Sequence, residues 1–85
     1  MSPEQDAIVN LMTYLYDNRE ELSKDKFSGM HKVDNTYRIH KSSFVPQILN
    51  RYLVDVDRTI AAVADIHFHN KGLVWDQPTY WITIS

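Results

Sequence analysis

The chain is 85 residues long, with 44% hydrophobic and 12% aromatic residues, which suffices for one small core and predicts a single domain over 1–85. It contains no cysteine, so disulfides and thiolate metal sites are excluded, and a formal net charge of -2 argues against binding of duplex DNA by bulk electrostatics alone. The acidic N-terminus and the lack of a long apolar run predict a cytoplasmic protein with no membrane partner.

The first segment carries a helix-start pattern. Ser2 can cap a helix, Pro3 suits its first position, and Gln5 completes a capping-box pattern. We expect one helix that ends near Ser23. Its buried stripe consists of apolar residues at helical spacing, namely Ile8, Leu11, Met12, Leu15 and Leu22.

The middle of the chain predicts a loop, a strand and a second helix. Residues 24–35 are mostly polar and include Gly29, so they are interpreted as a loop. Thr36–His40 alternates polar and apolar residues, as a strand does. Ser42 and Ser43 then offer caps for a helix. The residues expected on its inner face are Phe44, Ile48, Leu49, Tyr52 and Leu53.

A third helix and a hairpin complete the chain. Asp55 or Asp57 can cap the helix, which is expected to end before Asn70-Lys71-Gly72. Its inner stripe takes Ile60, Val63 and either Ile66 or His67. Two strands, Leu73–Trp75 and Tyr80–Ile84, then flank a turn over Asp76–Thr79. In the last strand we expect the face of Ile82 to be buried and Trp81 to be partly exposed.

This order of elements predicts an α+β fold, a winged helix-turn-helix with a long N-terminal helix. The alternative is a set of helices with a small antiparallel β-meander. In that version the third helix ends near Ala64 and Asp65–His69 forms a strand, because apolar residues alternate with histidines there.

No residue pattern indicates catalysis or a cofactor. Ser42 and Ser43 lack a glycine elbow, no glycine-rich phosphate loop is present, and Asp55 and Asp57 stand where helix caps are needed. The histidines of Asp65–His69 would share a face only on a strand, so we expect no metal site. The chain is therefore expected not to be an enzyme.

Basic residues gather in the middle of the chain. Met1–Ser23 has one basic and five acidic residues, whereas Lys24–Arg58 has seven basic and four acidic residues. Cations beside exposed rings suit single-stranded nucleic acid, because bases stack on rings and cations contact phosphates. The candidate nucleic-acid-binding residues are Arg38, Lys41, Arg51, Arg58, Trp75 and Trp81. Arg38 and Lys41 are expected to be exposed, so exchanging both for Glu would weaken binding without lowering stability.

The third helix is poorly equipped to read a major groove. Its outward positions carry one cation among two carboxylates and two alanines, whereas base readers use Arg, Asn, Gln or Lys. These outward positions are Asp57, Arg58, Ala61, Ala62 and Asp65. An exposed Trp81 also suits a contact with a protein partner.

Several segments together carry a family resemblance. They are Tyr37–His40, Ser43–Leu49, Asp57–Val63, Asn70–Val74 and Tyr80–Ile84. Their pattern resembles the small winged-helix modules at the C-terminal ends of primase- or helicase-like replication proteins of plasmids, phages and chromosomal cassettes. The resemblance implies contact with DNA or a replication protein, without catalysis. The alternative function is a protein-interaction module, an adaptor or inhibitor on the same scaffold.

Overall fold

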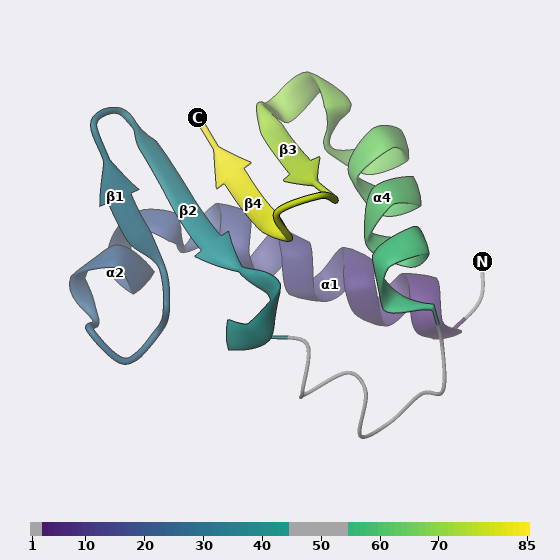
Figure 1. Ribbon diagram of the computed structural model, residues 1–85, viewed down its shortest axis with the longest axis horizontal. Coiled ribbons are helices and arrows are strands. Elements are labelled where there is room, and N and C mark those ends of the chain that lie inside the picture. The colour runs from purple at the N-terminus through teal and green to yellow at the C-terminus, as the bar shows by residue number, and fades with distance from the viewer. Residues whose placement is uncertain (1–2, 45–54) are drawn as a thin grey trace.

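The computed structural model describes residues 3–44 and 55–85 of the chain. The elements are α1 (Pro3–Asp17), α2 (Arg19–Lys24), β1 (His31–Val33), β2 (Thr36–His40), the 3-10 turn η1 (Lys41–Ser43), α4 (Val56–His67), the 3-10 turn η2 (His69–Lys71), β3 (Leu73–Asp76) and β4 (Trp81–Ile84). α1 crosses behind a four-stranded antiparallel sheet and α4 lies beside it (Figure 1). The predicted α+β class is confirmed.

Some sequence predictions lie outside the described residues. These are the cap at Ser2, the candidate site residue Arg51, and the helix that was expected to bury Ile48, Leu49, Tyr52 and Leu53. Of that helix, the structure describes only its expected beginning. There, Lys41–Ser43 form η1 and Phe44 is buried.

The N-terminal helix begins as predicted but is interrupted. α1 ends at Asp17, and α2 begins after Asn18, which has φ -111 and ψ 17. The backbone N–H and the side-chain amide of Asn18 both donate to the carbonyl of Tyr14, at 3.0 and 2.9 Å. Asn competes for backbone partners in this way and favours helix ends. The prediction of one helix reaching Ser23 is therefore wrong.

The expected loop contains an additional strand. β1 pairs antiparallel with β2, with Val33 opposite Thr36, so that Asp34 and Asn35 form a two-residue turn. Asp34 has φ 55, a left-handed conformation that Asp tolerates better than most residues. The prediction of a loop is wrong for His31–Val33, because this tight turn returns the chain along β2.

The four strands form a sheet in the order β1-β2-β4-β3. β2 pairs with β4, placing Ile39 opposite Ile82, and β4 pairs with β3, placing Trp75 opposite Ile82. The predicted C-terminal hairpin is confirmed, with Ile82 buried and Trp81 partly exposed. Tyr80 belongs to the turn rather than the strand, because its φ of 62 does not fit extended backbone.

α4 is the predicted third helix. Asp55 Oδ1 accepts a hydrogen bond from the backbone N–H of Arg58 at 3.1 Å, which confirms Asp55 as the cap. Ile60 and Val63 are buried as predicted. Neither proposed end of the inner stripe is buried, since Ile66 is 70% exposed and His67 is half-buried. Ala64 and Phe68 take this place instead.

The alternative β-meander is wrong over Asp65–His69. The helix continues to His67, and the backbone N–H of Phe68 still donates to the carbonyl of Ala64 at 3.1 Å. η2 then leads to Gly72, whose φ of 74 is the left-handed conformation that glycine adopts without steric cost. Gly72 therefore ends η2, and β3 begins at the next residue.

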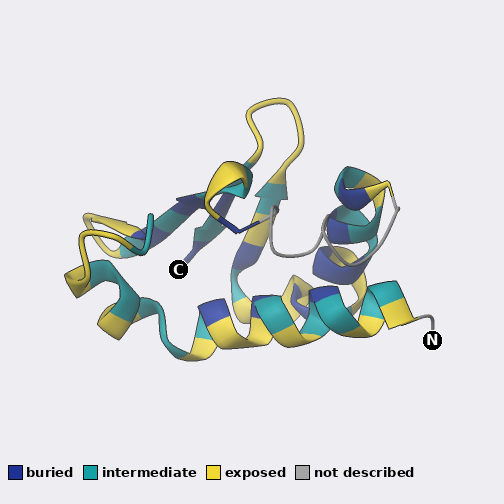
Figure 2. Ribbon diagram, turned by 90° about the horizontal axis from the view of Figure 1, so that it is seen from below, coloured by how far each residue is buried: buried dark blue, intermediate teal, exposed yellow. Residues whose placement is uncertain are grey.

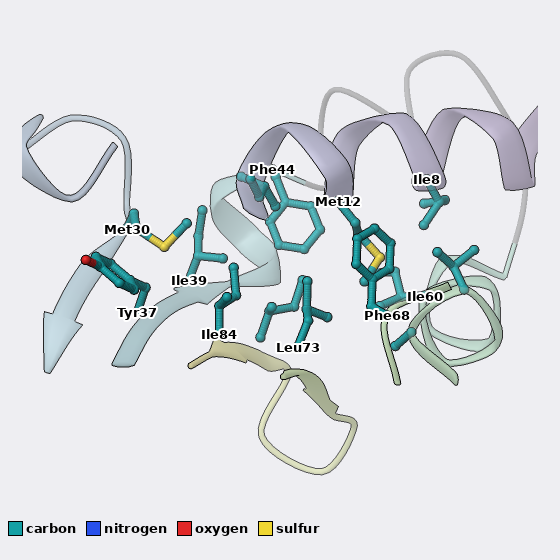
Figure 3. Packing of buried hydrophobic residues seen from close by; sticks show 14 of the residues in the cluster. Ile8, Met12, Met30, Tyr37, Ile39, Phe44, Ile60, Phe68, Leu73 and Ile84 are labelled. Atoms are coloured by element: carbon teal, nitrogen blue, oxygen red, sulfur yellow. The ribbon is translucent and has the colours of Figure 1, made fainter. Parts of the chain in front are cut away.

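One apolar core joins the helices to the sheet. α1 turns its buried residues toward the sheet and its exposed residues away from it (Figure 2). Ile8 and Met12 of α1 meet side chains from α4 and the sheet (Figure 3). The sheet contributes Tyr37, Ile39, Leu73, Ile82 and Ile84. Because the core takes this face of the sheet, the opposite face is left for other contacts.

Removing the α4 cap is expected to cost about 1 kcal/mol of unfolding free energy. In Asp55→Ala the N–H of Arg58 loses its side-chain acceptor, and the exposed ion pair with Arg58 adds little to this cost. Urea denaturation measures the effect. Asp65→Ala is the matched control, because Asp65 is exposed on the same helix. An equal effect of the two changes would contradict the capping role.

Candidate nucleic-acid interface

The sheet face that points away from the core carries aromatic and basic side chains. Ile39 and Ile82 are buried, so alternation along their strands directs Arg38, His40 and Trp81 outward. The register sets His40 opposite Trp81 and His31 opposite Arg38. We refer to the four residues His31, Arg38, His40 and Trp81 as the Trp81 face.

Three side chains surround the indole of Trp81. The guanidinium carbon of Arg38 lies 4.6 Å from the centroid of the indole, a cation–π distance. The His40 ring meets the indole edge-on, with centroids 5.2 Å apart and planes at 74°. The His31 ring lies 6.4 Å away. These neighbours explain why Trp81 is half-buried although it points away from the core, and they fix its orientation.

Arg38 is the cation that this face offers to a ligand. No carboxylate among residues 3–44 and 55–85 lies within ion-pair distance of its guanidinium. The side chain is half-buried because it lies along Trp81, so the expectation of an exposed Arg38 is wrong. Its positive charge nevertheless has no carboxylate partner in the part of the chain that the structure describes, and it lies over an aromatic ring.

His40 is held by a local hydrogen bond. Its Nδ1 accepts from the backbone N–H of Ser42 at 3.1 Å, and the Ser42 hydroxyl lies 2.8 Å from the same nitrogen. An Nδ1 that accepts carries no proton, so the neutral ring bears its hydrogen on Nε2. His40 thus caps η1. The helix for which Ser42 or Ser43 was expected to act as the cap lies outside the described residues.

Lys41 connects two elements instead of facing solvent. Its Nζ lies 2.7 Å from Asp57 Oδ1 of α4, and both side chains are 26% exposed. The same ammonium lies 3.9 Å from the Tyr80 ring centroid. The expectation that Lys41 is exposed is therefore wrong, because its charge is engaged by Asp57.

Lys41→Met is expected to lower the unfolding free energy by about 1–3 kcal/mol, because the Asp57 carboxylate stays half-buried without its charged partner. Thermal or urea denaturation measures this change. Lys24→Met is the control, because the Lys24–Glu21 pair is exposed and 3.9 Å long. Equal stability of both variants would contradict a stabilising role for Lys41.

Arg58 and Trp75 do not join the Trp81 face. Arg58 is exposed on the first turn of α4, where its Nε lies 3.7 Å from Asp55. Trp75 lies opposite Ile82, so it points to the core side of the hairpin, away from Trp81. Its Nε1 is buried and has no hydrogen-bond partner among the residues that the structure describes. The hairpin therefore separates the two tryptophans.

Of the six sequence candidates, the structure brings Arg38 and Trp81 together, with Lys41 next to them through Tyr80. His31, His40 and Tyr80 were not predicted from the sequence as neighbours of this site. Tyr80 meets the His40 ring at right angles with centroids 6.4 Å apart. The Asp34-Asn35 pair was the sequence signal that could have revealed His31, because a two-residue turn at this pair places His31 opposite Arg38.

The described residues show no metal site, and comparisons with known proteins identify no relative. Residues 3–44 and 55–85 contain no cluster of three or more side chains of His, Asp or Glu able to hold a metal ion. Within the same ranges, no helix combines the length and apolar character required to cross a bilayer. Comparisons with protein-family models, curated proteins and solved structures give no match to this chain. A functional proposal therefore rests on the chemistry of its own residues.

Proposed function

We propose that this chain is a non-catalytic domain that binds single-stranded nucleic acid through the Trp81 face. The observation that carries the proposal is the Arg38 guanidinium 4.6 Å above an outward-facing indole, with no carboxylate paired to it among the described residues. Nucleobases stack on aromatic rings and on guanidinium planes, while the charge of Arg contacts phosphate. Arg38 and Trp81 offer both interactions at one place.

A single strand suits this surface better than a duplex. Bases that are unpaired can reach the indole, whereas the paired bases of a duplex are stacked on one another. The outward side of α4 supplies one cation, Arg58, beside two carboxylates, which is little for a major groove. Since one cation of the Trp81 face is unpaired, we expect few phosphate contacts and weak binding that is strongest at low salt.

We also propose that the α+β fold is a winged helix and that the protein is a cytoplasmic replication accessory of a mobile element or phage. The topology supports the first point, since β2 precedes η1 and α4 and pairs with β4, the last strand of the hairpin that follows α4. β1 is an addition at the edge of that arrangement. The resemblance in the sequence supports the second point.

The test is a titration with fluorescein-labelled oligo(dT) and with a duplex of the same length, at low and high salt. In a Trp75→Phe background the remaining tryptophan is Trp81, so its fluorescence reports stacking directly. We expect tighter binding of oligo(dT) than of the duplex at low salt, with quenching of Trp81. Absence of oligo(dT) binding at low salt, or a preference for the duplex, would contradict the proposal.

A second candidate function is a protein-interaction module, an adaptor or inhibitor that uses the same side of the sheet. Val33 and Val74 are 45% and 60% exposed, and the register places Val74 opposite the outward-facing Thr83. Exposed apolar side chains near a tryptophan are typical of protein contacts. A lack of oligonucleotide binding would leave this function as the better interpretation of the Trp81 face.

A further inference from the structure

The outer edge of β3 has no strand partner among residues 3–44 and 55–85. β3 is the last strand in the order β1-β2-β4-β3, and within these ranges it pairs with β4. The N–H of Ser85 donates to the carbonyl of Gly72 at 3.0 Å, and these residues are opposite each other in register. Because hydrogen bonding alternates along an antiparallel strand, Val74 and Asp76 also bond toward β4. The backbone groups of Leu73 and Trp75 therefore point to the open edge.

A groove runs along this edge. It has a volume of about 410 Å³ and lies between β3 and α4. Ala61 and Ala64 of α4 line one side, and Leu73, Val74 and Trp75 of β3 line the other. The small alanine side chains leave space between the helix and the strand, which lie next to each other in Figure 1. A strand edge beside an open groove is the arrangement that accepts an extended peptide as an added strand.

The charge in the groove indicates the kind of peptide. Its charged and titratable lining residues are Asp65 on α4 and His69 on η2. Asp65 is exposed and forms no ion pair within residues 3–44 and 55–85. An unpaired carboxylate beside apolar lining favours a basic side chain flanked by apolar ones. Alternation along an extended peptide would direct every second side chain into the groove.

We propose that the groove between β3 and α4 binds an extended segment of a partner protein, which adds to β3 as a fifth strand and sets a Lys or Arg beside Asp65. The site goes beyond the proposed nucleic-acid function and does not depend on it. Trp75 of the groove and Trp81 lie on opposite sides of the hairpin, so the two ligands would contact different tryptophans. The chain would then join a protein partner to a nucleic acid.

The experiment is selection of phage-displayed random heptapeptides on the immobilised full chain. We expect enriched peptides with a Lys or Arg between β-branched or apolar residues at alternating positions. Synthetic copies should bind in solution, and N-methylation of alternate peptide nitrogens should abolish binding by removing strand hydrogen bonds. Failure to enrich any peptide, or enrichment of acidic ones, would overturn the proposal.

Variants of the chain locate the site. Ala61→Phe fills the groove and Asp65→Lys reverses its charge, so each is expected to weaken binding of a selected peptide at least about tenfold. Ala62→Phe is the matched control, because Ala62 does not line the groove. Asp65 is exposed, so we expect Asp65→Lys to fold even if Ala61→Phe does not. Asp65→Lys then tests the site without Ala61→Phe. Unchanged peptide binding by Asp65→Lys would place the peptide elsewhere.

Two further measurements distinguish a peptide in the groove from a nucleic acid and from a second copy of this chain. Oligo(dT) binding by Asp65→Lys should not be weaker than that of the unmodified chain, since Asp65 is not part of the Trp81 face and the exchange adds positive charge. Light scattering of the unmodified chain should give the monomer mass. A dimer that Ala61→Phe converts to a monomer would show that a second copy of this chain fills the groove, and the proposed peptide partner would then be wrong.

Discussion

Trp81→Ala is expected to weaken binding of oligo(dT) by roughly 1–3 kcal/mol, the range for loss of one stacked base. This corresponds to a loss in affinity of roughly 5- to 150-fold. The side chain lies outside the core and is half-buried by Arg38 and the two histidines, so thermal stability should change little by comparison. Fluorescence anisotropy with labelled oligo(dT) measures the affinity, and circular dichroism confirms the fold.

Two exchanges of Arg38 separate its charge from its shape. Arg38→Glu should weaken binding and flatten the salt dependence, by about 0.7 in slope for each phosphate that the protein no longer neutralises. Arg38→Lys keeps the charge but loses the planar group above the indole, so it should keep the salt slope and lose affinity. Lys24→Glu is the control, because Lys24 is 67% exposed on α2. If Trp81→Ala and Arg38→Glu bind like the unmodified chain, the Trp81 face is not the nucleic-acid site.

The exchanges of Trp81 and Arg38 are not combined with an exchange of Lys41, because Lys41 pairs with Asp57. From the sequence, a double exchange of Arg38 and Lys41 to Glu was expected to leave stability unchanged. Because Lys41 Nζ lies 2.7 Å from Asp57 Oδ1, a glutamate at this position would face a carboxylate and destabilise the contact between η1 and α4. Weaker binding by that double variant would then report partial unfolding as well as the removal of a phosphate-binding cation.

The elements that were predicted correctly carry local signals. Asp55 caps α4 through a hydrogen bond to a residue three positions away, and Gly72 ends the segment with a left-handed backbone. The alternation of Trp81–Ile84 indicated the buried face of the last strand. Each of these signals depends on residues within one or two turns of the chain, so a sequence shows them directly.

The two errors in the N-terminal half come from weak or misleading local patterns. β1 has three residues, all exposed, and so shows no alternation of buried and exposed positions. At Asn18 the apolar spacing continues across the break, since Leu22 still packs against the core from α2. Periodicity alone therefore predicted one helix, whereas the non-helical backbone of Asn18, with φ -111 and ψ 17, ends the first.

The candidate site was predictable in its residue types but not in its geometry. Arg38 and Trp81 meet because β2 pairs with β4 across a long stretch of chain, in a register that no local pattern specifies. The same pairing brings in His40, and the β1 hairpin brings in His31. Conversely, Trp75 was a site candidate together with Trp81 because both lie on the same hairpin. The strand register places the two side chains on opposite faces of that hairpin.

Ile60→Ala is expected to cost roughly 2–5 kcal/mol of unfolding free energy, because truncation removes buried apolar area and leaves a cavity. Ile60 is 0% exposed in α4, where the helix packs against α1, and Ile8 of α1 is also 0% exposed. Ile60 was predicted from the sequence as part of the inner stripe. The other residue for which such a loss was expected, Leu49, lies outside the described residues.

The loss of unfolding free energy expected for Ile60→Ala is large for a domain of 85 residues. A small domain has roughly 0.05–0.15 kcal/mol of stability per residue, so the loss is a large part of the total. Each kcal/mol should lower the melting temperature by about 4–8 °C. Ile66→Ala is the matched control, because Ile66 is 70% exposed on the same helix and should change stability by about 0.5 kcal/mol or less. Similar melting temperatures for the two variants would mean that α4 does not present Ile60 to the core.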